Sequence, residues 1–177
     1  MARLVFILKY VPGLAFVFFR FALPVWNFVL SNIYALWYIR DRRSAVRRLR
    51  DLRETVDGNP AELACWYSVV GFRWVADYWN GMLDFSQKPW VSVAKRTGDC
   101  DDMMTLAYYV LRRSHYRLHK GYTYSNDGCG HALLVLVDKA SGAVSVMDNM
   151  RFVGVFDSID DAMTSYYGVN TYYYYVV

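Results

Sequence analysis

The chain of 177 residues is long enough for one folded domain with its own core and too short for much beyond an N-terminal appendage. With 55% hydrophobic and 18% aromatic residues, it exceeds the roughly 45–50% apolar content of soluble domains, which favours a surface that meets lipid or a partner. Its net charge of +4 comes mainly from an arginine cluster at 40–53, and its three cysteines exclude a four-thiolate zinc site and argue against a disulfide framework.

The N-terminal region, residues 4–39, is almost wholly apolar, and its only charged residues are Lys9 and Arg20. Its longest uncharged run, residues 21–39, has about the length that crosses a bilayer. Seven arginines follow directly, between positions 40 and 53. By the positive-inside rule this pattern predicts a membrane anchor with the rest of the chain in the cytoplasm.

The same region also fits an amphipathic segment. Lys9, Arg20, Asn27 and Ser31 lie 11, 7 and 4 residues apart, which places them on one helical face. Such a segment can lie in the membrane interface or pack against copies of itself. We therefore expect residues 4–53 to contact an anionic membrane, with a homo-oligomer as the alternative. The arginine cluster lacks the motif of a specific nucleic-acid site.

An arginine-rich helix is expected over residues 45–56, and a turn ends it. Asn59 then has the position of an N-cap, with Pro60 at the first position of the next helix. These signals divide the chain into a membrane-associated part, residues 1–56, and a folded domain, residues 57–177.

The next helix is expected over residues 61–79, with Trp74 on its buried face and Cys65 in its packing. Residues 84–90 are typical of a loop that contains a proline. An amphipathic helix follows from Cys100 to about residue 113. The first half of the folded part is therefore expected to be helical.

The second half has strand patterns. Runs rich in Val and Leu at 131–137 and 143–147, separated by a turn, predict a β-hairpin. A strand at 152–156, a short helix at 158–167 and a closing strand at 171–177 complete the pattern. Helices first and strands afterwards indicate an α+β fold, in which helices pack on an antiparallel sheet. An N-terminal apolar helix is expected to precede this core in the chain.

Cys100 is the candidate nucleophile, because it begins a helix where unpaired backbone N–H groups and the macrodipole favour a thiolate. Asp99 is a candidate N-cap that fixes this turn. His131 opens a strand after small residues and is a candidate general base. Asp148 ends the partner strand of the hairpin, where it can orient the imidazole with help from Asn149.

The string Thr97-Gly98-Asp99-Cys100-Asp101-Asp102 resembles the signature of transglutaminase-like cysteine peptidases, particularly of their bacterial subfamily. The runs His131-Ala132-Leu133-Leu134 and Met147-Asp148-Asn149, and the loop at 84–90, fit the same pattern. The resemblance covers about residues 60–155. It implies a papain-like, transglutaminase-like core with a Cys-His-Asp triad that cleaves a peptide or isopeptide bond in a protein or peptide substrate.

The resemblance also bears on calcium, since some members of the subfamily bind it through acidic residues that flank the cysteine. Asp99 and Asp101 hold these positions, and carboxylates are the hard oxygen ligands that calcium prefers. The same acids, with Asp102, would also simply complement a helix N-terminus. No other cofactor is expected. Gln87, Trp90 and Asn149 are candidate contacts for the oxyanion and the substrate.

Several alternatives stay open. The same catalytic residues can transfer the acyl group to an amine, which would crosslink proteins. The chain can also be a catalytically silent scaffold in a membrane or viral assembly, with the tyrosines at 172–175 as a contact surface. Cys129 is a weaker candidate nucleophile, and His115 and His119 have a spacing seen in metal ligands but fit a solvated helix end or loop better.

Overall fold

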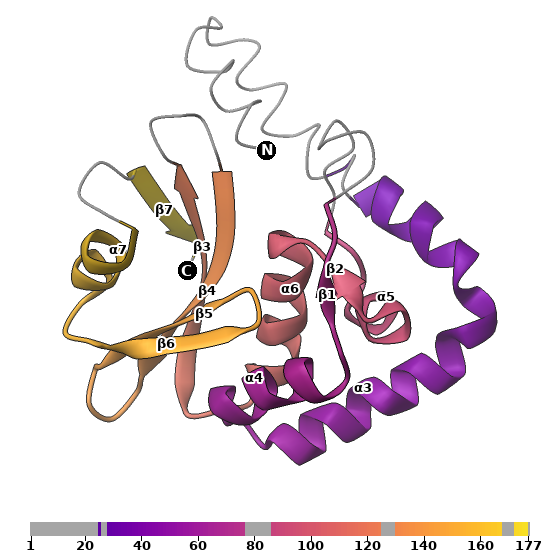
Figure 1. The fold of residues 1–177 in the computed structure, drawn as a ribbon, viewed down its shortest axis with the longest axis horizontal. Coiled ribbons are helices and arrows are strands. Elements are labelled where there is room, and N and C mark those ends of the chain that lie inside the picture. The colour runs from indigo at the N-terminus through magenta and orange to yellow at the C-terminus, as the bar shows by residue number, and fades with distance from the viewer. Residues whose placement is uncertain (1–24, 26–27, 77–85, 125–129, 168–171, 177) are drawn as a thin grey trace, which may run out of the picture.

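The computed structural model describes residues 25, 28–76, 86–124, 130–167 and 172–176 (Figure 1). Its centre is a five-stranded antiparallel sheet in the order β6-β5-β4-β3-β7. The strands of this sheet are β3 (Tyr116–Tyr124), β4 (Gly130–Asp138), β5 (Val144–Asp148), β6 (Arg151–Phe156) and β7 (Tyr172–Val176). A separate parallel pair joins β1 (Arg73–Trp74) to β2 (Thr97–Gly98).

Helices lie on both sides of the sheet. The chain is helical at 28–37 and continues into the short 3-10 helix η1 (Ile39–Asp41). The α-helices that follow are α3 (Arg42–Val56), α4 (Pro60–Val69), α5 (Pro89–Lys95), α6 (Cys100–Leu111) and α7 (Ile159–Tyr167). Figure 1 shows α6 between the sheet and the layer of α3, α4 and α5, with α7 beside the sheet on the other side. This mixed arrangement of helices on an antiparallel sheet is the expected one, and it is consistent with a papain-like fold.

The strand β4 is buried on both faces. Ala132 and Leu134 belong to the main core, together with residues of α3 and α6. Leu133 and Val135 point into a second core against α7. A strand covered on both faces carries a continuous apolar run, which explains the strong sequence signal of this segment. Each fully buried leucine here contributes about 1.5–3 kcal/mol to the stability of the fold.

The predicted helix from Cys100 is confirmed as α6. Met103, Ala107 and Val110, its expected inward side, are all buried in the main core. The helix ends at Leu111, slightly earlier than predicted. Because α6 packs against β4, its first residue is held near one end of the sheet.

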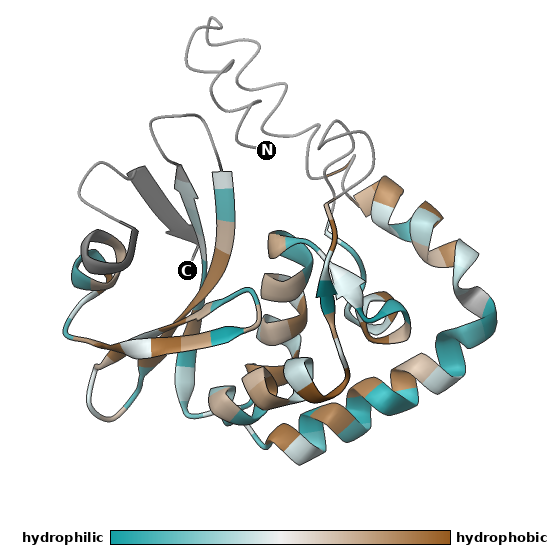
Figure 2. Cartoon of the chain, viewed as in Figure 1, coloured by the Kyte–Doolittle hydropathy of each residue, from teal (hydrophilic) through white to brown (hydrophobic). Residues whose placement is uncertain are grey.

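The arginine-rich helix is confirmed as α3. It buries one apolar side, formed by Ala45, Leu49, Leu52 and Val56, while most of its other residues are hydrophilic (Figure 2) and include six arginines. Asp57, with a left-handed φ of 43°, ends the helix. Since Leu49, Leu52 and Val56 belong to the same core as α6, this helix is part of the packing that supports the sheet.

The predicted start of α4 is correct, and its predicted end is wrong. Asn59 caps the helix by accepting the Ala61 N–H at 3.0 Å. The helix ends at Val69, ten residues before the expected end, because Gly71 takes a left-handed φ of 64° and turns the chain. Beyond it, Trp74 lies in β1.

Two packing predictions for this segment are also wrong. Trp74 is 53% exposed, because it lies in a two-residue strand instead of on a buried helix face. Cys65 is exposed as well, since its side of α4 faces away from the core. Residues 77–79, the end of the predicted helix, lie outside the described part of the chain.

The sequence patterns missed α5 and β3. The expected loop at 84–90 is a loop only at 86–88 among its described residues, because Pro89 starts α5 at the first helical position. β3 was missed because it has no continuous apolar run and Lys120 interrupts its apolar face, although Tyr116, Leu118 and Tyr122 share that face and pack on the main core. Alternation of apolar and polar residues is the signal of a half-buried strand.

The predicted hairpin is confirmed, with β4 antiparallel to β5 and Leu134 opposite Met147. The later elements also match, since β6, α7 and β7 cover the expected positions to within one residue at most ends. What the sequence did not indicate is the order of the strands, in which β7 pairs with β3 at the edge.

The predicted membrane-spanning helix at 21–39 is not supported. Within the described residues the continuous α-helix of this region runs from 28 to 37, and no helix there is long and apolar enough to cross a bilayer. The rest of the predicted apolar segment, residues 1–24 and 26–27, lies outside the described part of the chain.

Candidate active site

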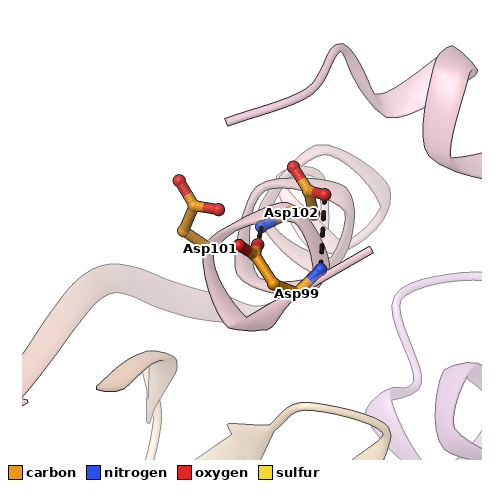
Figure 3. A group of neighbouring side chains, drawn as sticks. All are labelled: Asp99, Asp101 and Asp102. Carbon is orange, nitrogen blue, oxygen red and sulfur yellow. Dashed lines mark hydrogen bonds between the residues drawn. The ribbon is translucent and has the colours of Figure 1, made fainter. Parts of the chain in front are cut away.

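The N-terminus of α6 places Cys100 at the first helical position. Asp99 is the N-cap, and its Oδ1 accepts the Asp102 N–H at 3.3 Å. In return, Asp102 Oδ2 accepts the Asp99 N–H at 3.3 Å, which completes a capping box (Figure 3). Such a cap stabilises a helix by about 0.5–2 kcal/mol and fixes the turn that presents the cysteine. The expected N-cap role of Asp99 is confirmed.

Gly98 leaves the space that this cap needs. A Cβ atom at position 98 would lie 2.6 Å from the Asp102 Cβ and 2.8 Å from its Oδ2. Non-bonded atoms do not approach so closely in a packed interior, so a larger residue would push the Asp102 carboxylate away from Asp99. The sequence motif therefore has a physical reason at three positions: space at Gly98, a cap at Asp99 and a reciprocal acceptor at Asp102.

A chain of polar groups holds the buried Asp102 carboxylate from behind. Gln87 donates its backbone N–H to Asp102 Oδ1 at 2.6 Å and its side-chain amide to Oδ2. Gln87 Oε1 accepts from Lys95 Nζ at 3.1 Å, and the same ammonium donates to the Tyr34 hydroxyl at 2.7 Å. Buried charges need such partners, because an unpaired one costs several kcal/mol. We call Tyr34, Lys95, Gln87 and Asp102 the polar chain.

His131 lies near the start of β4 and Asp148 at the end of β5, and their side chains meet. His131 Nε2 and Asp148 Oδ1 are 2.5 Å apart, and the two side chains are 26% and 14% exposed. Cys100 lies close enough to the ring for its side chain to raise the pKa of His131. The imidazole therefore contacts the predicted orienting carboxylate and lies near the predicted nucleophile.

The charge of His131 depends on these two neighbours. Burial lowers the pKa of His131, but hydrogen bonds to Asp148 and Cys100, with the negative charge of both groups, outweigh it and raise the pKa to about 9. At neutral pH a ring with this pKa is an imidazolium, paired with Asp148. Such a ring can give a proton to a leaving group.

Strand pairing explains how residues 17 positions apart in sequence meet. Because β4 and β5 are antiparallel, the first residues of β4 and the last residues of β5 lie at the same end of the sheet. Directly after Asp148, Asn149 takes a left-handed φ of 49° and ends the strand. Its Oδ1 is buried and accepts no hydrogen bond within the described residues. The structure thus places Asn149 next to the site without giving it a partner there.

Gln87 and Trp90, the expected substrate contacts, make structural contacts in this state. Gln87 is 3% exposed, and its amide bonds to Asp102 and Lys95. Trp90 is partly buried in the first turn of α5 and packs between the main core and the helix at 28–37. Their role toward a substrate stays a prediction.

Two of the remaining candidates, His115 and His119, lie away from this site. The third, Cys129, lies outside the described residues. His115 contacts Asp138 Oδ2 at 3.2 Å, at the opposite end of β4. His119 lies within β3, so the expected helix end or loop is wrong at this position. Burial and the charge of Arg117 lower the pKa of His119.

Asp99, Asp101 and Asp102 form a cluster that is tight enough for a metal ion, the one such group of acidic, histidine and cysteine side chains within the described residues. Their ligand oxygens all lie within 4.8 Å of one another. Calcium takes oxygen ligands at 2.3–2.6 Å, so two ligands of one ion can be separated by up to about 5 Å. The spacing and the carboxylate chemistry therefore both suit calcium.

The three carboxylates differ in the hydrogen bonds that they already accept. Both oxygens of Asp102 already accept N–H groups, whereas the Asp101 carboxylate stands to one side of the cap (Figure 3). Lys120 lies near Asp101: burial lowers the pKa of Lys120, and the Asp101 charge partly offsets this. Asp99 and Asp101 are therefore the better placed of the three carboxylates to hold a cation.

Sequence reasoning missed the structural part of this site. The spacing of Asp99 and Asp102 is that of a capping box, which would have identified the role of Asp102. No comparable local signal marks Lys95 or Tyr34. Lys95 and Tyr34 come into contact because Val91 of α5 packs against the helix at 28–37.

Comparisons with known proteins give a likeness of fold. No family model and no curated protein sequence matches the chain. Among solved structures, calcium-bound LapG of Legionella pneumophila matches with a TM-score of 0.50 and 17% identity, over 70% of this chain and 74% of that one. A candidate cysteine protease from Cytophaga hutchinsonii matches with a TM-score of 0.44 and 12% identity, over 73% of this chain and 46% of that one. The match to LapG supports the fold predicted from the transglutaminase-like signature.

Proposed function

We propose that the chain is a cysteine hydrolase that cleaves a peptide or isopeptide bond, with Cys100 as nucleophile, His131 as acid and base, and Asp148 as the group that orients the imidazole. The observation that carries this proposal is the position of one ring, which lies 2.5 Å from Asp148 Oδ1 and close enough to Cys100, the first residue of α6, for that side chain to raise its pKa. Covalent acyl transfer needs a nucleophile beside a base, with a third group that orients the base.

In the first half-reaction the Cys100 sulfur attacks the carbonyl carbon of the substrate and a C–S bond forms. The imidazolium of His131 gives its proton to the leaving nitrogen as the C–N bond breaks, so an amine departs and a thioester remains. Asp148 stabilises the positive ring before this transfer. The raised pKa of His131 keeps the proton available for it at neutral pH.

In the second half-reaction the neutral His131 takes a proton from water, whose oxygen attacks the thioester. The C–S bond breaks, the sulfur leaves as thiolate, and a carboxylic acid is released while the imidazolium is restored. An amine in place of water would give a new amide by the same steps. Hydrolysis and acyl transfer therefore share these residues and differ in the acceptor.

The oxyanion of the intermediate needs donors that are fixed in advance. The backbone N–H of Cys100, one of the unpaired groups of the first turn of α6, is one such donor. Gln87 uses its side-chain amide on Asp102, so we assign it a positioning role through the capping box. This differs from the direct oxyanion contact expected from the sequence.

Limited alkylation followed by mass spectrometry of each cysteine tests the proposal. Cys65 is the internal control, because it is exposed and lies outside the site. We expect Cys100 to react at least tenfold faster than Cys65 at pH 7, and the H131A variant to lose this advantage. Equal rates at Cys100 and Cys65 in the wild-type chain would contradict the proposal and favour a catalytically silent scaffold.

Substrate turnover is measured separately, with peptide amides in the presence and absence of a primary amine. The C100A variant should abolish both products, since no other described group is placed to form the thioester. The D148N variant should keep the fold and lower the rate by about ten- to ten-thousandfold, because the ring loses its orienting charge. Amide products that appear only with the added amine would assign acyl transfer.

We also propose that Asp99 and Asp101 hold calcium, whose charge would balance the acids around Cys100. Calorimetric titration with CaCl2 should then show binding, and D101N should weaken it at least tenfold. E62Q, an acid in the first turn of α4, is the matched control and should bind as the wild type does. Saturating calcium should also raise the melting temperature by several degrees. If no heat of binding is seen, the calcium proposal fails and the cysteine hydrolase proposal is unaffected.

A further inference from the structure

The helix at 28–37 exposes its large apolar side chains and buries its smaller and more polar ones. The exposed residues are Phe28 (65%), Val29 (39%), Ile33 (50%), Leu36 (59%) and Trp37 (75%). At 100° per residue they fall within one half of the helix, which we call the apolar face. The opposite half carries Ser31, Tyr34 and Ala35, all buried. A helix of a soluble domain normally has the reverse arrangement.

This orientation is fixed by contacts on the buried half. Tyr34 and Ala35 pack with Val91 of α5. The Tyr34 hydroxyl accepts from Lys95 Nζ at 2.7 Å, and the ammonium also lies 4.9 Å from the centre of the Tyr34 ring. The apolar face is therefore held outward by the protein.

A segment rich in exposed arginines follows the helix at 28–37 directly along the chain. The exposed arginines of η1 and α3 are Arg40, Arg42, Arg43, Arg47, Arg48 and Arg50. The buried side of α3, with Leu49 and Leu52, keeps them on the outside. Three acids on the same stretch, Asp41, Asp51 and Glu54, offset only part of this charge. Figure 1 shows the two helices as one continuous bent arm along the outside of the molecule.

We propose that this arm docks on an anionic membrane surface, with the apolar face in the interfacial region and the arginines on the lipid phosphates. An anionic membrane offers apolar chains to the apolar face and phosphates to the arginines, so it suits both parts of the arm. A nucleic acid would pair with the arginines and leave Phe28, Ile33 and Trp37 in water. A second copy would cover the apolar face but bring two arginine clusters together, where like charges repel.

Vesicle co-sedimentation of the full chain tests this proposal, with phosphatidylcholine alone against a mixture containing phosphatidylglycerol. The variants are I33E/W37E on the apolar face and R42E/R43E/R47E on the arginine helix. The matched controls are V155E, at an apolar side chain of β6 that is 74% exposed, and R112E/R113E, at exposed arginines after α6. Thermal unfolding of each variant shows whether it has kept the fold, and all changed side chains are exposed.

We expect the wild-type chain and both controls to bind the anionic vesicles at least tenfold more tightly than the neutral ones. Both test variants should lose at least tenfold in that binding, and added salt should weaken it. Undiminished binding of the folded test variants would overturn the proposal. Two other results would also overturn it. The first is a wild-type chain that does not bind vesicles but forms a dimer in light scattering, which I33E/W37E dissociates. The second is a wild-type chain that does not bind vesicles but binds DNA, with R42E/R43E/R47E losing that binding.

Discussion

The His131 side chain sets how the site responds to pH. Its pKa of about 9 lies above the ordinary value of 6.5, because the contacts with Asp148 and Cys100 outweigh the effect of burial. A group whose pKa is raised on folding stabilises the fold fully below its unfolded pKa. That contribution is lost as the pH rises from about 6.5 through about 9.

Urea unfolding of the wild-type chain and H131Q should therefore differ most at pH 6 and least at pH 10. The variant removes the titrating ring and keeps a polar side chain of similar length. The enhanced reactivity of Cys100 relative to Cys65 should fade over the same upper range, as His131 loses its proton. A difference in stability that grows from pH 6 to pH 10 would contradict the assigned pKa.

A second prediction at the scale of residues concerns Gly98, where the structure leaves no room for a side chain. G98A places a Cβ atom 2.6 Å from that of Asp102, so we expect a loss of about 1–3 kcal/mol in the free energy of unfolding and slower alkylation of Cys100. G142A is the control, because Gly142 has a φ of 78° but no heavy atom within 4 Å of a Cβ there. It should cost about 1 kcal/mol through backbone strain and leave Cys100 unchanged. Equal effects on Cys100 in both variants would argue against the capping-box explanation.

At the scale of elements, α6 depends on α5 and the helix at 28–37 through the polar chain. In K95M, Gln87 Oε1 and the Tyr34 hydroxyl lose their donor. We expect a loss of about 1–3 kcal/mol in stability and a several-fold slower alkylation of Cys100. K88M is the matched control, since Lys88 precedes the same helix and contacts only the Phe28 ring, at 5.3 Å, among the interactions described. If K95M lowers stability but leaves Cys100 as reactive as in K88M, the chain has no positioning role.

Elements with strong local signals could be predicted from the sequence. The start of α6 has Asp99 as a cap, β4 has a continuous apolar run and β5 is rich in Val, so the elements that carry the three expected site residues could be predicted. α5 and β3 have no continuous apolar run: α5 is seven residues long, and the alternating pattern of β3 is interrupted by Lys120. The over-long α4 shows the same limit, since apolar spacing continued past Gly71 although the chain turned there.

At the scale of the whole molecule, strand order and the packing of α3 depend on contacts between residues far apart in sequence, which local patterns do not encode. α3 is the clearest case. Its arginines marked it as a membrane-facing segment, while its leucines fill the core beneath α6. One helix therefore serves the core and the outer surface together.

This gives a prediction about the core. L52A should lower the free energy of unfolding by about 2–5 kcal/mol, because Leu52 is only 4% exposed and lies in the main core. V46A on the outer side of the same helix, 37% exposed, should cost less than about 1 kcal/mol. Urea unfolding of both variants measures the contrast. Equal losses would mean that α3 does not support the core.

The polar chain has a consequence for where the proposed enzyme works. Its outer end, Tyr34, belongs to the helix with the apolar face, and its inner end, Asp102, caps the helix that carries Cys100. Binding of lipid at the outer end would restrain Tyr34 and, through Lys95 and Gln87, the catalytic turn. We expect interfacial activation: turnover per molecule that rises on a lipid surface, even for a water-soluble substrate.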